Sequence, residues 1–193
     1  MSSSPRSSAP RFSLLVPTNA NVVGLDLLRD SLLMRTEDPS EVEFVLLDNA
    51  NTRGVDLRPW MENFARQWPD ASLRLVVLPE RVGYSAACQR LLAQARGEYP
   101  VFLNDDVVAE PRWDVNLRAL ISGISHVDCW LLTDPLPHEW SGWACRRSFL
   151  EKYPFRTTFP GGYYEDDDLY LRVALAEGLT LKTREGQDFL TIN

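Results

Sequence analysis

The sequence predicts an α/β fold with a mostly parallel central sheet. Short apolar runs alternate with helical segments over residues 12–104, which is the pattern of βαβ units joined by right-handed crossovers. Each apolar run ends in polar residues, and the carboxyl ends of parallel strands share one edge of a sheet, where ligands bind. We therefore expect a nucleotide-binding type of half-domain with its site at that edge.

The helices of this half are predicted from apolar spacing. Trp60, Phe64 and Trp68, for example, recur every four residues and share one helical face. The expected strands and helices alternate, beginning with a strand, over residues 12–16, 22–34, 42–47, 57–68, 73–78, 83–95 and 99–103.

The pattern after residue 106 is less regular. A helix is expected over 113–121 and another over 165–177, the second closed by Gly178. Because no internal repeat or linker interrupts 12–184, we interpret 12–193 as a single domain. Short strands are expected over 128–133, 142–145 and 179–182.

Composition restricts the classes of function. The net charge of −7 argues against a nucleic-acid binder, which would carry a basic face. No apolar run approaches the roughly 20 residues that span a bilayer. The Ser/Pro-rich residues 1–11 are expected to be a disordered tail rather than a secretory signal. The three cysteines lack metal-ligand spacing, so we expect reduced thiols and a cytoplasmic location.

Asn104, Asp105 and Asp106 follow an apolar strand directly. One interpretation is a surface turn, because Asn and Asp favour turns. The other is a metal site, because adjacent carboxylates repel each other unless a cation compensates. Hard oxygen ligands without Cys or His suit Mg²⁺ or Mn²⁺, which fill their remaining positions with phosphate oxygens and water. The position at the end of the fourth strand favours the metal site.

Four consecutive acids, residues 165–168, open the last helix. The helix macrodipole alone favours acids at this position. A carboxylate at a helix start beside a Gly-rich turn could also act as a general base. An EF-hand is disfavoured, because the alternating ligands and the central Gly are missing.

Two further pairs of residues give weaker signals. Asp48 and Asn49 end a strand, where they could cap a turn or accept hydrogen bonds from a nucleotide base. Gly83 would let the backbone approach a ligand and Arg81 could bind a phosphate, although a helix start with a solvated Arg explains both equally well. No Walker or G-x-G-x-x-G pattern is present, which disfavours classical ATP and dinucleotide folds.

Taken in order, these segments resemble the inverting glycosyltransferase family two, which has the GT-A fold, a three-layer α/β/α sandwich. The resemblance covers roughly residues 12–182, and Asn104 in place of the first acid of D-x-D is similar to rhamnosyltransferase-like members. The segments that carry it are residues 14–18, 47–52, 81–90, 97–107, 142–147 and 165–172.

The resemblance implies roles for individual residues. Asp106 would be the main ligand of Mn²⁺ or Mg²⁺, and Asp166 would be the catalytic base with Glu165 as neighbour or substitute. Trp143 and Asp168 would lie near the transferred sugar or the acceptor. The domain would divide into a nucleotide-binding half, 12–106, and an acceptor-side half, 107–193. The implied contacts with the donor nucleotide come from Pro17, Thr18, Asp48, Arg81, Gly83, Asn104 and Asp105.

The function that the resemblance implies is transfer of a sugar, with inversion, from a UDP- or dTDP-sugar to a hydroxyl of a glycan, lipid-linked sugar or protein glycan. The short region after the acidic helix leaves open a non-catalytic nucleotide-sugar or glycan-binding module. It also leaves open peripheral association with a membrane or a partner domain. A sugar-phosphate nucleotidyltransferase is less well supported, because residues 18–21 are neither Gly-rich nor basic.

Overall fold

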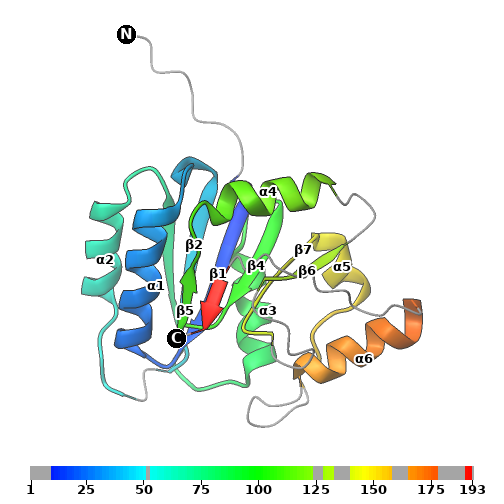
Figure 1. The fold of residues 1–193 in the computed structure, drawn as a ribbon. Coiled ribbons are helices and arrows are strands. Elements are labelled where there is room, and N and C mark those ends of the chain that lie inside the picture. Colours follow the sequence, from blue (N-terminus) through cyan, green and yellow to red (C-terminus); the bar gives the residue numbers. More distant parts are fainter. Residues whose placement is uncertain are drawn as a thin grey trace.

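The computed structural model describes residues 10–50, 53–123, 128–132, 140–157, 165–177 and 190–192. Six strands form one sheet in the order β3-β2-β1-β4-β7-β6, shown in Figure 1. The first four strands of the chain run parallel, whereas β7 is antiparallel to β4 and β6 is antiparallel to β7. A mostly parallel central sheet is therefore confirmed. Its strands are β1 (Phe12–Thr18), β2 (Val42–Asp48), β3 (Ser72–Val77), β4 (Tyr99–Leu103), β6 (Cys129–Leu131) and β7 (Gly142–Cys145).

Helices cover both faces of the sheet, so the fold has three layers. One buried cluster joins the sheet to α1, α2 and α4, and a second joins the opposite face to α3, α5 and α6. The bounds are α1 (Val22–Arg35), α2 (Arg58–Gln67), α3 (Tyr84–Gln94), α4 (Trp113–Gly123), α5 (Arg147–Lys152) and α6 (Glu165–Glu177), with a 3₁₀ turn η1 (Pro39–Glu41). The alternation predicted for residues 12–104 is confirmed, with every boundary within two residues.

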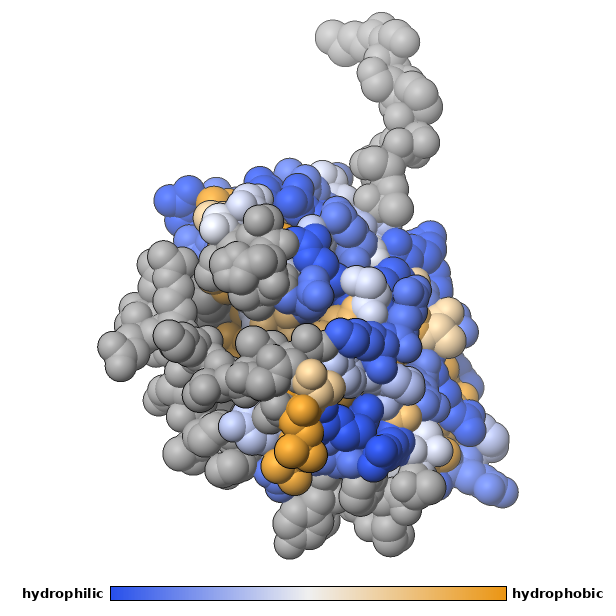
Figure 2. Space-filling view, turned by 90° about the vertical axis from the view of Figure 1, so that its right-hand side faces the viewer, coloured by the Kyte–Doolittle hydropathy of each residue, from blue (hydrophilic) through white to orange (hydrophobic). Residues whose placement is uncertain are grey.

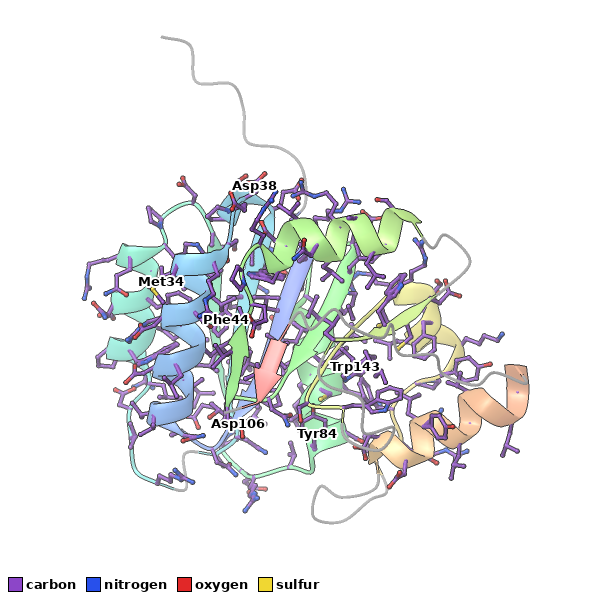
Figure 3. The ribbon with its side chains drawn as sticks, in the orientation of Figure 1. Met34, Asp38, Phe44, Tyr84, Asp106 and Trp143 are labelled. Carbon is purple, nitrogen blue, oxygen red and sulfur yellow. The ribbon has the colours of Figure 1, made fainter. Side chains whose placement is uncertain are left out.

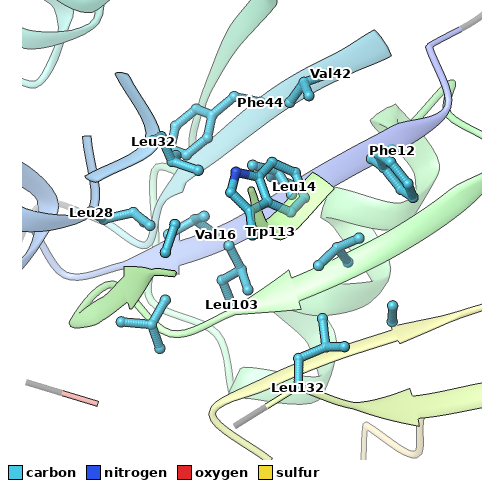
Figure 4. Close-up of a cluster of buried hydrophobic side chains, with 14 of the residues drawn as sticks. Phe12, Leu14, Val16, Leu28, Leu32, Val42, Phe44, Leu103, Trp113 and Leu132 are labelled. Carbon is cyan, nitrogen blue, oxygen red and sulfur yellow. The ribbon is translucent and has the colours of Figure 1, made fainter. Parts of the chain in front are cut away.

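The central strands form because their sequences are almost continuously apolar. Every residue of β2 is buried, as expected for a parallel strand covered by helices on both faces. Alternate residues of β1 point into different clusters: Leu14 faces the α1 side and Leu15 the α3 side. Figure 4 shows the first cluster, in which Trp113 of α4 lies against Leu14 and its neighbours.

The amino edge of the sheet is held by a buried polar group. Glu43, at the start of β2, is fully buried and accepts hydrogen bonds from Ser13 Oγ at 2.7 Å and from Arg96 N and Nε, each at 2.8 Å. Ser13 Oγ in turn accepts from Gly97 N at 2.8 Å. A Cβ at Gly97 would lie 2.6 Å from Ser13 Oγ and 2.9 Å from the carbonyl carbon of Phe12, so only glycine permits this approach.

Three elements were not expected from the sequence. Strands β5 (Val107–Ala109) and β8 (Leu190–Ile192) pair antiparallel in a separate two-stranded sheet, and α5 is a helix of only six residues. Such short elements carry little periodic signal and depend on tertiary contacts. The strand expected over 128–133 is limited to β6. The strand expected over 179–182 lies outside the described residues, as does most of the expected tail, residues 1–9.

On the face turned toward the viewer in Figure 2, the coloured residues are mainly hydrophilic, with several small hydrophobic areas between them. Leu171 and Leu175 of α6 are exposed. Among the described helices, none is both long enough and apolar enough to cross a bilayer.

Candidate active site

A cleft of about 770 Å³ opens at the carboxyl end of the parallel strands. Figure 3 shows Asp106 and Tyr84 at this end of the sheet and Asp38 at the opposite end. This is the edge where open α/β sheets bind ligands. The lining residues follow four different strands: Pro17, Thr18, Asn19, Asn21, Asn49, Arg53, Arg81, Val82, Gly83, Tyr84, Ala87, Asn104, Asp105 and Asp106.

The cleft brings together most of the residues that were expected to contact a donor or a metal. They are Pro17, Thr18, Arg81, Gly83, Asn104, Asp105 and Asp106. Asp48, Trp143, Asp166 and Asp168 are not among the described residues that line it, and Glu165 is placed as the first residue of α6.

Two adjacent aspartates face different surroundings. Asp105 accepts a hydrogen bond of 2.5 Å from Thr18 Oγ1 and one of 3.4 Å from Asn21 Nδ2. Asp106 lines the cleft, and its carboxylate has no hydrogen-bond or ion-pair partner within the described part of the chain. The family resemblance assigned the two carboxylates different roles, but local chemistry does not distinguish them. Within the described residues, hydrogen bonds engage Asp105 and none engages Asp106.

The pKa of Asp105 is raised above its ordinary value. Burial is the main cause, because it penalises the charged form, and the negative charge of Asp106 adds to it. Hydrogen bonds from Thr18 and Asn21, together with the positive charge of Arg53, oppose the shift without cancelling it. The pair of acids thus places negative charge in the cleft that a bound cation would compensate.

Asp48 and Asn49 occupy different positions at the end of β2. Asp48 is buried and does not line the cleft, whereas Asn49 does. The Asn49 side chain pairs reciprocally with the backbone of Val82: its Nδ2 donates to the carbonyl at 2.9 Å, and its Oδ1 accepts from the amide at 2.9 Å. Asn49 therefore fixes the loop that carries Arg81 and Gly83, which is a role that its position in the sequence did not indicate.

The acidic start of α6 is held in place by core packing and ion pairs. Leu169 is buried in the second core cluster, and Asp168 forms ion pairs with Arg156 at 2.9 Å and Arg172 at 2.7 Å. Asp166 Oδ1 accepts from the amide of Asp167 at 3.0 Å, as a residue in the first turn of a helix does. Figure 1 shows that α6 begins at the same edge of the sheet where the cleft opens.

Trp143 is an aromatic core residue. Its ring is 2% exposed and stacks on Phe102 with 4.5 Å between ring centroids. Trp140 and Phe155 pack edge-on against it. Trp143 is therefore held within the second core cluster and is not among the described residues that line the cleft.

Several lining residues were not among the predicted site residues, and they include Asn21, Arg53 and Tyr84. Asn21 precedes α1 and accepts from Gly24 N at 3.4 Å, so its N-cap position was a readable signal. Tyr84 also lines the cleft and lies within the segment 81–90 that carries the family resemblance, whereas no motif or periodicity marks Arg53.

The cleft residues suit a divalent cation of a particular kind. Among the described residues, no group of three or more His, Cys, Asp or Glu side chains is arranged to hold a metal. The available donors are the Asp106 carboxylate and the neighbouring Asn104 amide. Mg²⁺ is commonly held by one or two carboxylates plus substrate phosphates. The residues therefore fit a hard cation shared with a diphosphate, and not one held by protein ligands alone.

Known proteins share this fold. TarS residues 1–349 from S. aureus, solved in complex with UDP, is similar with a TM-score of 0.74 and 17% identity over 94% of this chain and 60% of that chain. The mannosyltransferase PcManGT from Pyrobaculum calidifontis, in complex with GDP-Man and Mn²⁺, gives a TM-score of 0.67 and 21% identity over 88% of this chain and 53% of that chain. These likenesses confirm the GT-A fold.

Sequence comparison gives the family. The O-antigen biosynthesis protein RfbC of Myxococcus xanthus is 34% identical over 112 residues, which are 56% of this chain and only 8% of RfbC. The chain thus spans a small part of that relative. The model of the family "Glycosyl transferase family 2" matches residues 14–135, more than half of the chain. The chain belongs to glycosyl transferase family 2.

Proposed function

We propose that the chain is a metal-dependent inverting glycosyltransferase. It moves a sugar from a nucleoside-diphosphate sugar to an acceptor hydroxyl of a glycan, a lipid-linked sugar or a protein glycan. The observation that carries this proposal is the available carboxylate of Asp106 in a polar cleft at the carboxyl edge of a parallel sheet. Membership of the family supports it.

The donor occupies the 770 Å³ cleft. Pro17 and Thr18 border the base, while Arg81 and Gly83 lie toward the ribose and diphosphate. The neighbours solved with UDP, UDP-GlcNAc or GDP-Man support a nucleotide sugar as the donor. The contact of Asp48 with the base stays a prediction, because this side chain is buried and is not among the described residues that line the cleft.

Asp106 would hold Mn²⁺ or Mg²⁺, with Asn104 beside it. When bound, such a cation supplies positive charge next to the departing diphosphate. The structure of PcManGT with Mn²⁺ supports this choice of cation. Arg81 and Arg53 line the same cleft and add positive charge at the phosphates.

Asp166 acts as the general base. It accepts the proton of the acceptor hydroxyl as that oxygen forms a bond to the anomeric carbon. The bond from that carbon to the diphosphate oxygen breaks in the same step, which inverts the configuration. Glu165 is the neighbour or substitute, and Asp168 and Trp143 hold the acceptor side in place through the contacts of α6 and the core.

We place the enzyme in the cytoplasm, in polysaccharide biosynthesis, as a single domain over residues 12–193. The three cysteines are free and buried, which supports a reducing compartment. The relative named for O-antigen biosynthesis supports a glycan or lipid-linked acceptor.

A donor screen tests the proposal. UDP-, dTDP- and GDP-sugars are incubated with the protein and Mn²⁺ or Mg²⁺, and thermal shift and released nucleoside diphosphate are measured. We expect metal-dependent release from one donor class. A thermal shift without any release, in the presence of saccharide acceptors, would instead identify a non-catalytic binding module.

Asp166→Asn tests the base. The amide keeps the shape of the side chain but cannot accept a proton, so transfer should fall about 100- to 10,000-fold. Donor affinity should stay within about twofold, because Asp166 does not line the described cleft. Asp70→Asn, a change at an exposed turn, is the control. Wild-type turnover in Asp166→Asn would remove Asp166 from this role.

A further inference from the structure

Asp105 and Asp106 form the turn between β4 and β5. Val107 and Ala109 of β5 are fully buried, and β5 packs against α1. Ser31 of α1 accepts a hydrogen bond from Ala109 N at 2.9 Å. The chain that follows Asp106 is therefore fixed to α1.

The chain that precedes Asp106 is fixed to the same helix. A Cβ at Gly24, in the first turn of α1, would lie 2.5 Å from the backbone oxygen of Asp105 and 2.6 Å from Asn21 Nδ2. Real Cβ atoms do not approach a backbone oxygen this closely, so the backbone of Asp105 rests directly on the bare Gly24. Gly24 is buried and does not line the cleft.

Side chains complete the attachment. The Thr18 hydroxyl donates to Asp105 Oδ2 at 2.5 Å and accepts from Asn21 N at 3.3 Å. Asn21 Nδ2 donates to the second oxygen of Asp105, while its Oδ1 caps Gly24 N. The three polar groups thus link the end of β1, the start of α1 and the turn after β4 in one hydrogen-bonded set.

We propose that Asp105 is a positioning residue: through Thr18, Asn21 and Gly24 it anchors to α1 the turn that carries Asp106, and so fixes where the Asp106 carboxylate lies in the cleft. This inference rests on the proposed function for the use made of Asp106. It assigns to Asp105 a role different from the donor contact that the family resemblance implies, because both of its oxygens are already engaged by protein donors.

Hydrogen exchange tests the anchoring without any ligand. We expect Gly24→Ala to speed amide exchange over residues 104–109 about tenfold or more, because the added methyl group displaces the Asp105 backbone. Exchange in β2 should be unchanged. Gly123→Ala is the matched control, since a Cβ there meets nothing within 4 Å. Unchanged exchange over 104–109, or an equal rise in β2, would overturn the proposal.

A second pair of variants tests the same anchoring if Gly24→Ala does not fold. Thr18→Val removes the hydroxyl at nearly constant volume, whereas Thr18→Ser keeps it. The valine variant should show the local rise in exchange, and the serine variant should restore wild-type rates. Equal exchange in the two variants would contradict a role for the hydroxyl bond to Asp105.

The affinity for Mn²⁺ in the presence of UDP then measures whether the loss of anchoring displaces the Asp106 carboxylate. In Gly24→Ala, the affinity for Mn²⁺ in the presence of UDP should fall about fivefold or more, while metal-free UDP affinity stays within about twofold. Faster local exchange with wild-type Mn²⁺ affinity would overturn the positioning role. If the wild-type protein binds no Mn²⁺ in the presence of UDP, the proposed function is contradicted. The exchange rates of the variants relative to wild type would still show whether Gly24 and Thr18 anchor the turn.

Discussion

Each end of the parallel sheet holds an acid withdrawn from solvent, Glu43 completely and Asp105 partly, and the surroundings of the two acids differ. At the amino edge, Glu43 accepts from a serine hydroxyl and from the backbone and guanidinium of Arg96, with Arg74 at 3.7 Å. At the carboxyl edge, the donors to Asp105 among the described residues are two neutral side chains; another acid, Asp106, lies beside it, and the positive charge of Arg53 acts on it.

The two pKa values shift in opposite directions as a result. Burial by itself raises the pKa of Glu43, but the hydrogen bonds from Arg96 and Ser13 and the charge of Arg96 outweigh it, so the pKa is lowered. For Asp105 burial prevails and the pKa is raised. The charge of Glu43 is compensated by arginines within the protein, whereas the charge of Arg53 does not cancel the raised pKa of Asp105, and a bound cation could add positive charge there.

The largest expected effect is a loss of activity on changing Asp106 at the carboxyl edge. Asp106→Asn should lower metal-dependent release of nucleoside diphosphate about 100- to 1,000-fold, because the amide is a much poorer cation ligand. The free energy of unfolding should change by less than about 0.5 kcal/mol, since this carboxylate has no partner among the described residues. Steady-state kinetics and urea unfolding measure the two quantities, with Asp70→Asn as the control. Full activity would contradict the assignment of the metal ligand.

Glu43→Gln should show the opposite pattern. It removes a buried charge that is paired with Arg96, so we expect about 2–3 kcal/mol lower free energy of unfolding. UDP affinity at a temperature where the variant is folded should be unchanged. Glu62→Gln, at an exposed position of α2, is the control. A loss below about 0.5 kcal/mol would show that the amino edge is not held by this carboxylate.

Gly97→Ala tests the packing at the amino edge of the sheet. The added methyl group would lie 2.9 Å from backbone of β1, which must move, so we expect a loss of about 1–3 kcal/mol. Gly123→Ala, at the exposed last residue of α4, should instead leave the free energy of unfolding unchanged or raise it by up to about 0.5 kcal/mol, because alanine favours the helix. Thermal unfolding of both variants compares them directly. Equal midpoints would refute the close approach at Gly97.

The smallest effect is in the acid dependence of stability. Because the pKa of Glu43 is lowered on folding, its contribution is complete above its ordinary value of 4.5 and is lost as the pH falls through the folded value. Denaturation of wild type should therefore become easier below about pH 4.5. The decline should be shallower in Glu43→Gln. Parallel curves for the two proteins would contradict the lowered pKa.

Sequence patterns predicted the scaffold well because it depends on local chemistry. The apolar run of β2 and the four-residue spacing of Trp60, Phe64 and Trp68 are each readable within a few residues. The polar ends of the strands predicted the edge at which the cleft lies, since parallel strands must bring those ends together. Short elements such as α5, β5 and β8 were not predicted, because their stability comes from partners distant in the chain.

By itself, then, the sequence determined the alternating scaffold, the edge of the site and the set of acids found there. The family resemblance assigned Asp106 to a cation and Asp105 to the donor, but only the tertiary structure showed the contacts by which the two acids differ. Asp105 and Asp106 are chemically identical neighbours, yet Thr18 and Asn21, more than eighty residues earlier, engage one of them and leave the other for a ligand. Which donor reaches a carboxylate depends on side-chain contacts between β1, α1 and the turn after β4, and a local pattern does not contain such contacts.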